Sequence, residues 1–131
     1  MSFCTVINCM DGRVQVPVIR YLQDRFKADY VDSITEPGPN RVLAEDQNSA
    51  QVQSILDRLQ ISVEKHQSAG IAIVGHHDCA GNPAPKETQL KHIEAALTWI
   101  GRLYANVVVI GLWVDQDWVV HEVCDSRKEH K

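Results

Sequence analysis

The chain has 131 residues, of which 44% are hydrophobic and 23% are charged, and its formal net charge is −4. These values are ordinary for a soluble globular protein, and they leave room for one domain, which we place at residues 1–131. No basic run is long enough to indicate nucleic-acid binding, and no apolar stretch approaches the ~20 residues of a membrane span, so neither partner is expected.

The amino-terminal sequence indicates the cellular compartment, and the compartment in turn indicates the state of the cysteines. Residues 1–7 lack the positive start and long apolar region of a signal peptide, so we expect a cytoplasmic protein. Thiols stay reduced there. The four cysteines are therefore expected to bind a metal, take part in catalysis or fill the core, rather than to form disulfides.

Taken in order, apolar strand patterns alternate with helical patterns. Strands are predicted at residues 3–8, 29–35, 71–74, 106–113 and 118–123. Helices are predicted at residues 16–27, from a cap at Asn48 or Ser49 to an end at 68–70, and along an apolar face at 90–103. Two prolines and a glycine predict a loop at residues 36–40.

This order predicts the α/β class, with a mostly parallel β-sheet flanked by helices. The last strand follows its predecessor at hairpin spacing, so we expect it to be an antiparallel edge strand. In such sheets, ligands bind outside the carboxyl ends of the strands, where the strand order reverses.

Two motifs lie at such strand ends. Cys9-Met10-Asp11-Gly12-Arg13 follows the first strand, and His76-His77-Asp78-Cys79 follows the third. If these strands are parallel neighbours, Cys9, His76 and Cys79 converge. Two thiolates and one imidazole with a spare position form one of the ligand sets that zinc enzymes use.

Asp11 and Arg13 fit the same chemistry. Two thiolates cancel the charge of Zn²⁺, which makes the ion a weaker Lewis acid than one held by three imidazoles. A carboxylate at Asp11 could aim a bound hydroxide by accepting its hydrogen bond. Arg13 would keep that carboxylate ionised through a charge-assisted pair.

The two motifs, followed by Ala80-Gly81, resemble the paired signatures of β-class carbonic anhydrases, and the resemblance covers most of the chain. It implies reversible hydration of carbon dioxide to bicarbonate by a zinc-bound hydroxide. By the family pattern, Cys9, His76 and Cys79 would be the zinc ligands. Asp11 and Arg13 would orient the nucleophile, or Asp11 would take the fourth zinc position in a closed form. The resemblance also implies a homodimer or higher homo-oligomer, with sites near the subunit interface.

The sequence departs from the family pattern in two places. Members usually begin with a helical arm, whereas the first strand predicted here starts at residue 3. Thr35-Glu36-Pro37-Gly38-Pro39-Asn40 stands where members show an arginine-asparagine-alanine-glycine type of sequence, which places the acidic Glu36 near the pocket. Two alternatives follow: a zinc hydrolase acting on carbonyl sulfide or carbon disulfide, and a non-catalytic zinc protein with Asp11 permanently on the metal.

Simpler roles are expected for the other candidates. Cys4 and Cys124 should fill the core. His77 should be a surface residue, with proton transfer as its alternative role. Asp78 should hold its loop through backbone amides. The remaining residues are expected to have structural or surface roles, with a subunit contact as the alternative for the two tryptophans: Trp113, Trp118, His66, His92, His121 and His130.

Overall fold

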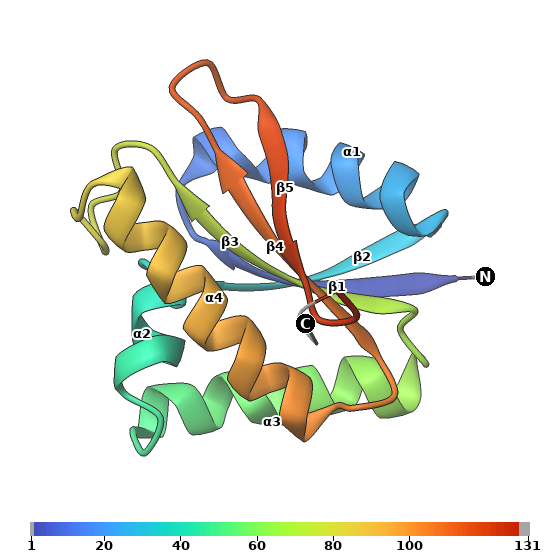
Figure 1. The fold of residues 1–131 in the computed structure, drawn as a ribbon. Helices are drawn as coiled ribbons and strands as arrows, with labels where there is room; N and C mark the ends of the chain where they lie inside the picture. Colours follow the sequence, from blue (N-terminus) through green and yellow to red (C-terminus); the bar gives the residue numbers. More distant parts are fainter. Residues whose placement is uncertain (1, 129–131) are drawn as a thin grey trace.

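The computed structural model describes residues 2–128, and the expected surface residue His130 lies outside this range. Five strands form one sheet in the order β2-β1-β3-β4-β5 (Figure 1). The strands are β1 Phe3–Cys9, β2 Tyr30–Glu36, β3 Gly70–His76, β4 Val108–Val114 and β5 Val120–Asp125. The helices are α1 Gln15–Phe26, α2 Pro39–Glu45, α3 Ala50–Lys65 and α4 Lys86–Leu103, and a 3₁₀ turn at Gly12–Val14 precedes α1.

The strand pairing confirms the predicted fold class. β1 to β4 are mutually parallel where they pair, and β5 lies antiparallel to β4 at the edge. From β1 the chain crosses to β2 on one side and later to β3 on the other. The strand order therefore reverses between β1 and β3, and their carboxyl ends mark the position at which α/β sheets bind ligands.

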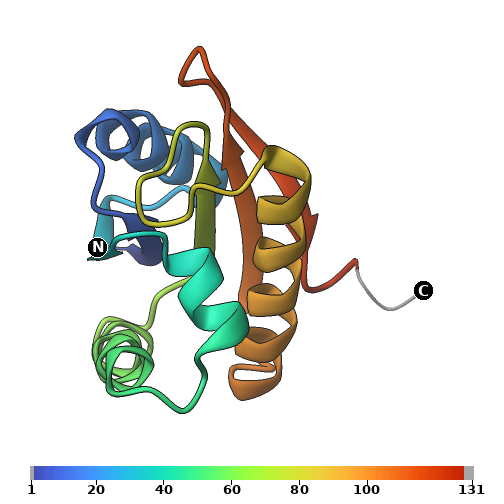
Figure 2. The ribbon, with the colours of Figure 1, turned by 90° about the vertical axis from the view of Figure 1, so that its left-hand side faces the viewer.

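Alternating side chains of the strands build two apolar cores, one on each face of the sheet. Val14, Val18 and Leu22 of the α1 segment cover the first face, where they meet even-numbered residues such as Val6 and Val74. Figures 1 and 2 show α3 and α4 on the side of the sheet away from α1. Their buried side chains pack there on odd-numbered residues of β1, β3 and β4 and on Ile34 of β2. This period of two explains why β1 and β3 have few polar positions.

The predicted loop at residues 36–40 is wrong in its second half, because α2 begins at Pro39. Proline suits the first helical position, where its missing N–H leaves no hydrogen bond unmade. Gly38 enters the helix with a φ of 57°, in the left-handed region that glycine tolerates. The prolines and the glycine therefore start a helix here.

The predicted end of the second helix is also wrong. α3 starts as expected, with the Ser49 hydroxyl accepting a hydrogen bond from the amide of Val52 (3.1 Å), but it ends at Lys65. Gly70 is already the first residue of β3. A Cβ at Gly70 would lie 2.2 Å from the ring of Phe26, so this glycine makes room for helix packing.

The last hairpin is displaced by about two residues from its predicted place. The Asp115 carboxylate accepts hydrogen bonds from the amides of Asp117 (2.9 Å) and Val119 (3.0 Å), which extends the turn to Val119. β5 therefore starts at Val120. Among residues 2–128, no helix combines the length and the apolar character that crossing a bilayer requires.

Candidate metal centre

The ends of β1 and β3 bring the three predicted ligand residues together. Cys9 and His76 are the last residues of these strands, and Cys79 follows three residues after His76. One ligand atom from each residue lies within 4.8 Å of the others, and all three residues are buried. The Sγ atoms of Cys9 and Cys79 are 3.8 Å apart. In a tetrahedral site with Zn–S bonds of about 2.3 Å, two sulfurs lie about 3.8 Å apart, so the spacing fits zinc.

The ring of His76 has the orientation that a metal ligand needs. Its Nδ1 lies 2.7 Å from the carbonyl oxygen of His77, and because a carbonyl only accepts, Nδ1 carries the proton. Nε2 then presents a lone pair. This atom is buried and has no hydrogen-bond partner among the described residues. A buried polar atom without a partner is costly, and a metal ion in the cluster would satisfy it.

The two thiols share a hydrogen bond that separates their acidities. The Cys79 thiol donates to Cys9, which lowers the pKa of Cys9, although burial opposes this. The same bond raises the pKa of Cys79. Burial lowers the pKa of His76, but the neighbouring Cys9 and the hydrogen bond to the His77 carbonyl outweigh it and raise the pKa overall. Thiolates are the form that binds metals, and the lowered pKa favours this form at Cys9.

Asp11 and Arg13 form a bidentate ion pair beside the cluster. Nη2 of Arg13 donates to Oδ2 of Asp11 at 2.7 Å, and Nε donates to Oδ1 at 3.0 Å. The Arg13 amide also donates to Oδ1 at 2.9 Å. These hydrogen bonds lower the pKa of Asp11 to about 2. The carboxylate is therefore ionised at neutral pH and turned toward Arg13.

Asp78 lies on the other side of Arg13 and differs from its prediction. Its carboxylate was expected to accept hydrogen bonds from backbone amides, but Oδ2 accepts from Nη1 of Arg13 at 3.2 Å. The Asp78 carbonyl accepts from Nη2 at 3.1 Å. Asp78 has a φ of 59°, in the left-handed region that aspartate adopts more readily than most residues. The loop after β3 is therefore tied to the loop after β1 through one guanidinium.

Two glutamines that the sequence did not single out hold the ligand strands. Nε2 of Gln15 donates to the carbonyls of Cys9 (2.7 Å) and Asp11 (2.9 Å). Gln89 is buried on α4, where it accepts from the His76 amide (3.2 Å) and donates to the His76 carbonyl (2.9 Å). A buried glutamine within an apolar helix face was the available signal for Gln89, whereas no pattern marked Gln15.

Glu36 does not face the cluster. It pairs with Cys9 in the register of β1 and β2. Its carboxylate, however, turns to α3, where Oε2 accepts from Nη2 of Arg58 at 2.6 Å and Oε1 accepts from Nε2 of Gln51 at 3.1 Å. Glu36 could have been a pocket group or a structural charge, and its contacts support the structural role, because α3 supplies its partners.

The loops after β2 and β3 meet through two glycines. A Cβ at Gly38 would lie 2.6 Å from the carbonyl carbon of Gly81, and a Cβ at Gly81 would lie 2.4 Å from the carbonyl carbon of Pro37. Neither position has space for a side chain. This close backbone contact fixes the wall of the site beside Cys79.

The remaining candidates mostly have the expected structural roles. Cys4 is fully buried, and burial raises its pKa to about 11. Cys124 is half-buried against the α3–α4 core. Trp113 is buried, and Trp118 is half-buried on the hairpin. His77 is exposed, with its ring 6.5 Å from that of Trp118. The other described histidines pair with carboxylates: His66 with Asp32, His92 with Glu45 and His121 with Asp115.

A mostly parallel sheet with a Cys-His-Cys cluster at its switch point defines an α/β protein with a site that could hold a metal ion. A family model described as "Putative carbonic anhydrase" matches residues 1–124, and the chain belongs to this family. Among solved structures, the fold is similar to that of tetrameric β-carbonic anhydrases from the filamentous ascomycete Sordaria macrospora. The TM-score is 0.65 and the identity 14%, over 93% of this chain and 81% of that one. No curated protein sequence matches the chain.

Proposed function

We propose that this protein is a zinc-dependent carbonic anhydrase that hydrates carbon dioxide reversibly to bicarbonate. The observation that carries the proposal is the buried Nε2 of His76, which has no hydrogen-bond partner within residues 2–128 and lies beside two thiols whose sulfurs are 3.8 Å apart. The family membership and the β-carbonic anhydrase fold support the same reaction. When bound, zinc supplies a Lewis acid that lowers the pKa of water and so makes a nucleophile available near neutral pH.

In this proposal, the three ligand residues divide the work of binding. Cys9 and Cys79 provide two negative charges, and His76 provides a neutral nitrogen whose orientation its bond to the His77 carbonyl fixes. Gln89 holds the backbone of His76 from both sides, so the imidazole has little freedom to turn away. Asn82 and Gly81 donate backbone hydrogen bonds to the sulfur of Cys79.

Asp11 acts as the acceptor that orients the attacking water. Because its pKa is lowered to about 2, it stays ionised over the physiological range and can accept a hydrogen bond throughout. Arg13 holds both carboxylate oxygens, and this favours a carboxylate that is available to the reactants over one that occupies the fourth position on the metal. The pair therefore supports an enzyme over a non-catalytic zinc protein.

The hydrolase alternative relied on an altered pocket wall around an intact ligand set. Glu36 is bound to Arg58 and Gln51 of α3, so its carboxylate does not add an acidic group to that wall. Carbon dioxide is thus the substrate that the family and the site jointly favour. Assays with carbonyl sulfide on the same preparation compare the two substrates directly.

Stopped-flow hydration of carbon dioxide on zinc-loaded protein tests the proposal, with zinc assayed on the same sample from about pH 6.5 to about pH 9. We expect activity that rises with pH and is lost in Asp11→Ala without loss of zinc. Asp24→Ala is the matched control, because Asp24 is an exposed carboxylate of α1 that pairs with Lys27 on the surface. Full zinc occupancy without hydration at any pH would overturn the proposal.

We also propose that the protein assembles as a homodimer or higher homo-oligomer in the cytoplasm. The similar enzymes of Sordaria macrospora are described as tetrameric. Thiolate ligands need a compartment in which thiols stay reduced, and the proposed ligands Cys9 and Cys79 are both free thiols. Light scattering coupled to size-exclusion chromatography measures the assembly, and a single monomeric species would contradict it.

A further inference from the structure

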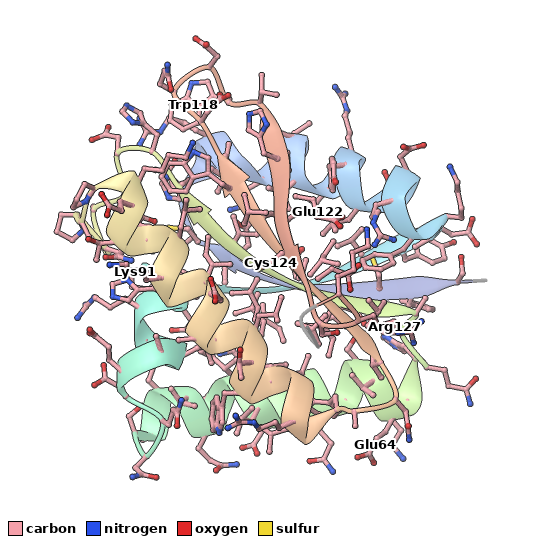
Figure 3. All side chains as sticks on the ribbon, in the orientation of Figure 1. Glu64, Lys91, Trp118, Glu122, Cys124 and Arg127 are labelled. Carbon is pink, nitrogen blue, oxygen red and sulfur yellow. The ribbon has the colours of Figure 1, made fainter. Side chains whose placement is uncertain are left out.

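The β4–β5 hairpin brings an aromatic ring to the Asp11–Arg13 pair. Figure 3 shows Trp118 near the tip of this hairpin, above the carboxyl ends of the strands. The Cζ atom of Arg13 lies 4.5 Å from the centroid of the Trp118 ring. A guanidinium over an indole face at this distance makes a cation–π contact, and tryptophan is the strongest partner for it. Trp118 therefore contacts the cation that holds Asp11.

The hydrogen bonds of Arg13 all use its N–H groups, so they leave one flat face of the guanidinium open to the Trp118 ring. Nε and Nη2 donate to the Asp11 carboxylate, while Nη1 and Nη2 donate to Oδ2 and the carbonyl of Asp78. All of these N–H groups lie in the plane of the guanidinium. These hydrogen bonds prevent the guanidinium from rotating within its own plane, but they restrain less strongly a tilt of that plane. The Trp118 ring covers one face and supplies the contact that opposes tilting.

Hydrogen bonds of Asp115 hold the turn that carries Trp118. Oδ1 of Asp115 accepts from the amides of Asp117 (2.9 Å) and Val119 (3.0 Å), and Oδ2 lies 2.8 Å from Nε2 of His121. The Trp118 amide donates to the Asp115 carbonyl at 3.0 Å. Trp118 has a φ of 63°, which is uncommon for a bulky residue and persists only where the surroundings hold it.

We propose that Trp118 is a positioning residue: it fixes the tilt of Arg13 and thereby keeps the Asp11 carboxylate in one orientation at the metal centre. The kinetic part of this inference rests on the proposed function, whereas the effect on Arg13 does not depend on it. Three connections then build the site, since the loops after β1 and β3 supply the ion pairs and the β4–β5 hairpin supplies the ring.

Simple packing is the competing explanation, because the Trp118 ring also lies against the α1-face core and near His77. Two substitutions separate the explanations. Trp118→Phe keeps an aromatic face for the guanidinium, whereas Trp118→Leu keeps apolar bulk without one. A packing role predicts similar losses for both, while a positioning role predicts that phenylalanine restores what leucine does not.

Heteronuclear NMR of the Arg13 Nε–H group measures the positioning without an activity assay. We expect solvent exchange of this proton to be about two- to fivefold faster in Trp118→Leu than in the wild type, and close to wild type in Trp118→Phe. Trp118→Gly suits the positive φ, so faster exchange in that variant cannot come from a strained turn. Unchanged exchange in both the leucine and the glycine variants would overturn the proposal.

Stopped-flow hydration gives the second measurement. We expect kcat to fall about two- to fivefold in Trp118→Leu and Trp118→Gly, with KM and zinc content unchanged and with most of kcat kept in Trp118→Phe. Gln116→Ala, an exposed position of the same hairpin, is the control. Equal kcat in the leucine and phenylalanine variants, or a loss of zinc that parallels kcat, would refute the positioning role. A wild type without hydration would refute the proposed function, and the exchange measurement would still decide the role of Trp118.

Discussion

A methyl group added at Gly81 should force apart the two loops that frame the metal centre. A Cβ there would lie 2.4 Å from the carbonyl carbon of Pro37 and 2.6 Å from the amide nitrogen of Gly38. Both are backbone atoms, so no side-chain rotation can relieve the overlap. The loop after β2 or the loop after β3 must move in Gly81→Ala.

The cost follows from this overlap. Forcing extra carbon into a well-packed site typically destabilises a protein by about 1–3 kcal/mol, and we expect the free energy of unfolding of Gly81→Ala to fall by that amount. Zinc affinity should fall as well, because the Gly81 and Asn82 amides hydrogen-bond to the sulfur of Cys79. The two effects have the same origin but can be measured separately.

Urea unfolding of the metal-free protein, in chelator, measures the stability term. Gly101→Ala is the matched control, because the same methyl group at this α4 position has its nearest neighbour at 3.6 Å. In a helix, the change from glycine to alanine should stabilise by up to about 1 kcal/mol. The two variants should therefore shift in opposite directions. A Gly81→Ala variant as stable as the wild type would refute the packing argument, whatever the control does.

The remaining predictions concern the ligands, the core and the pocket wall. Arg13→Ala should lower kcat by about a hundredfold while zinc stays bound, whereas Cys79→Ser should lose the zinc itself; equal metal loss in both would contradict this division of roles. The Cys4 thiol has a pKa of about 11 in the folded protein and about 9 in the unfolded chain. As the pH rises, the unfolded chain therefore loses this proton first, and the free energy of unfolding should fall between about pH 9 and about pH 11, by up to about 3 kcal/mol. Alkaline unfolding of Cys4→Ala should lack that part of the slope, and an unchanged slope would count against the burial of the thiol. Glu36→Gln should keep hydration within about twofold and lose less than about 1 kcal/mol in urea melts, because it keeps an acceptor for Gln51 and weakens a half-exposed pair with Arg58; a large loss of activity would show that Glu36 acts in the pocket.

The fold was largely predictable because its signals are local and agree with one another. Short apolar runs separated by helical patterns leave few arrangements other than a parallel sheet. The predicted helix boundaries were wrong where glycine or proline, which often end a helix, has another structural role. Gly70 resembles a helix stop but makes room for Phe26, and Pro39 resembles a helix breaker but occupies a position where a helix accepts proline.

Within the site, the sequence predicted only residues with metal-binding or charged side chains that follow directly after a predicted strand. Cys9 and His76 lie at the last positions of adjacent strands, so topology alone brings them together. Gln15 and Trp118 act through contacts that no spacing encodes. The Trp118–Arg13 contact joins residues more than a hundred positions apart, and it depends on a turn conformation that a tryptophan seldom adopts.

The departure from the family pattern at residues 35–40 has a physical reason in this chain. The segment has to turn from β2 into α2 within a few residues while its backbone touches Gly81. Gly38 provides the left-handed turn and the space, and Pro39 starts the helix. Glu36 faces the opposite way and anchors α3 through Arg58. The packing of these loops therefore explains the altered sequence at residues 35–40. For that reason the alteration does not by itself indicate a change of substrate.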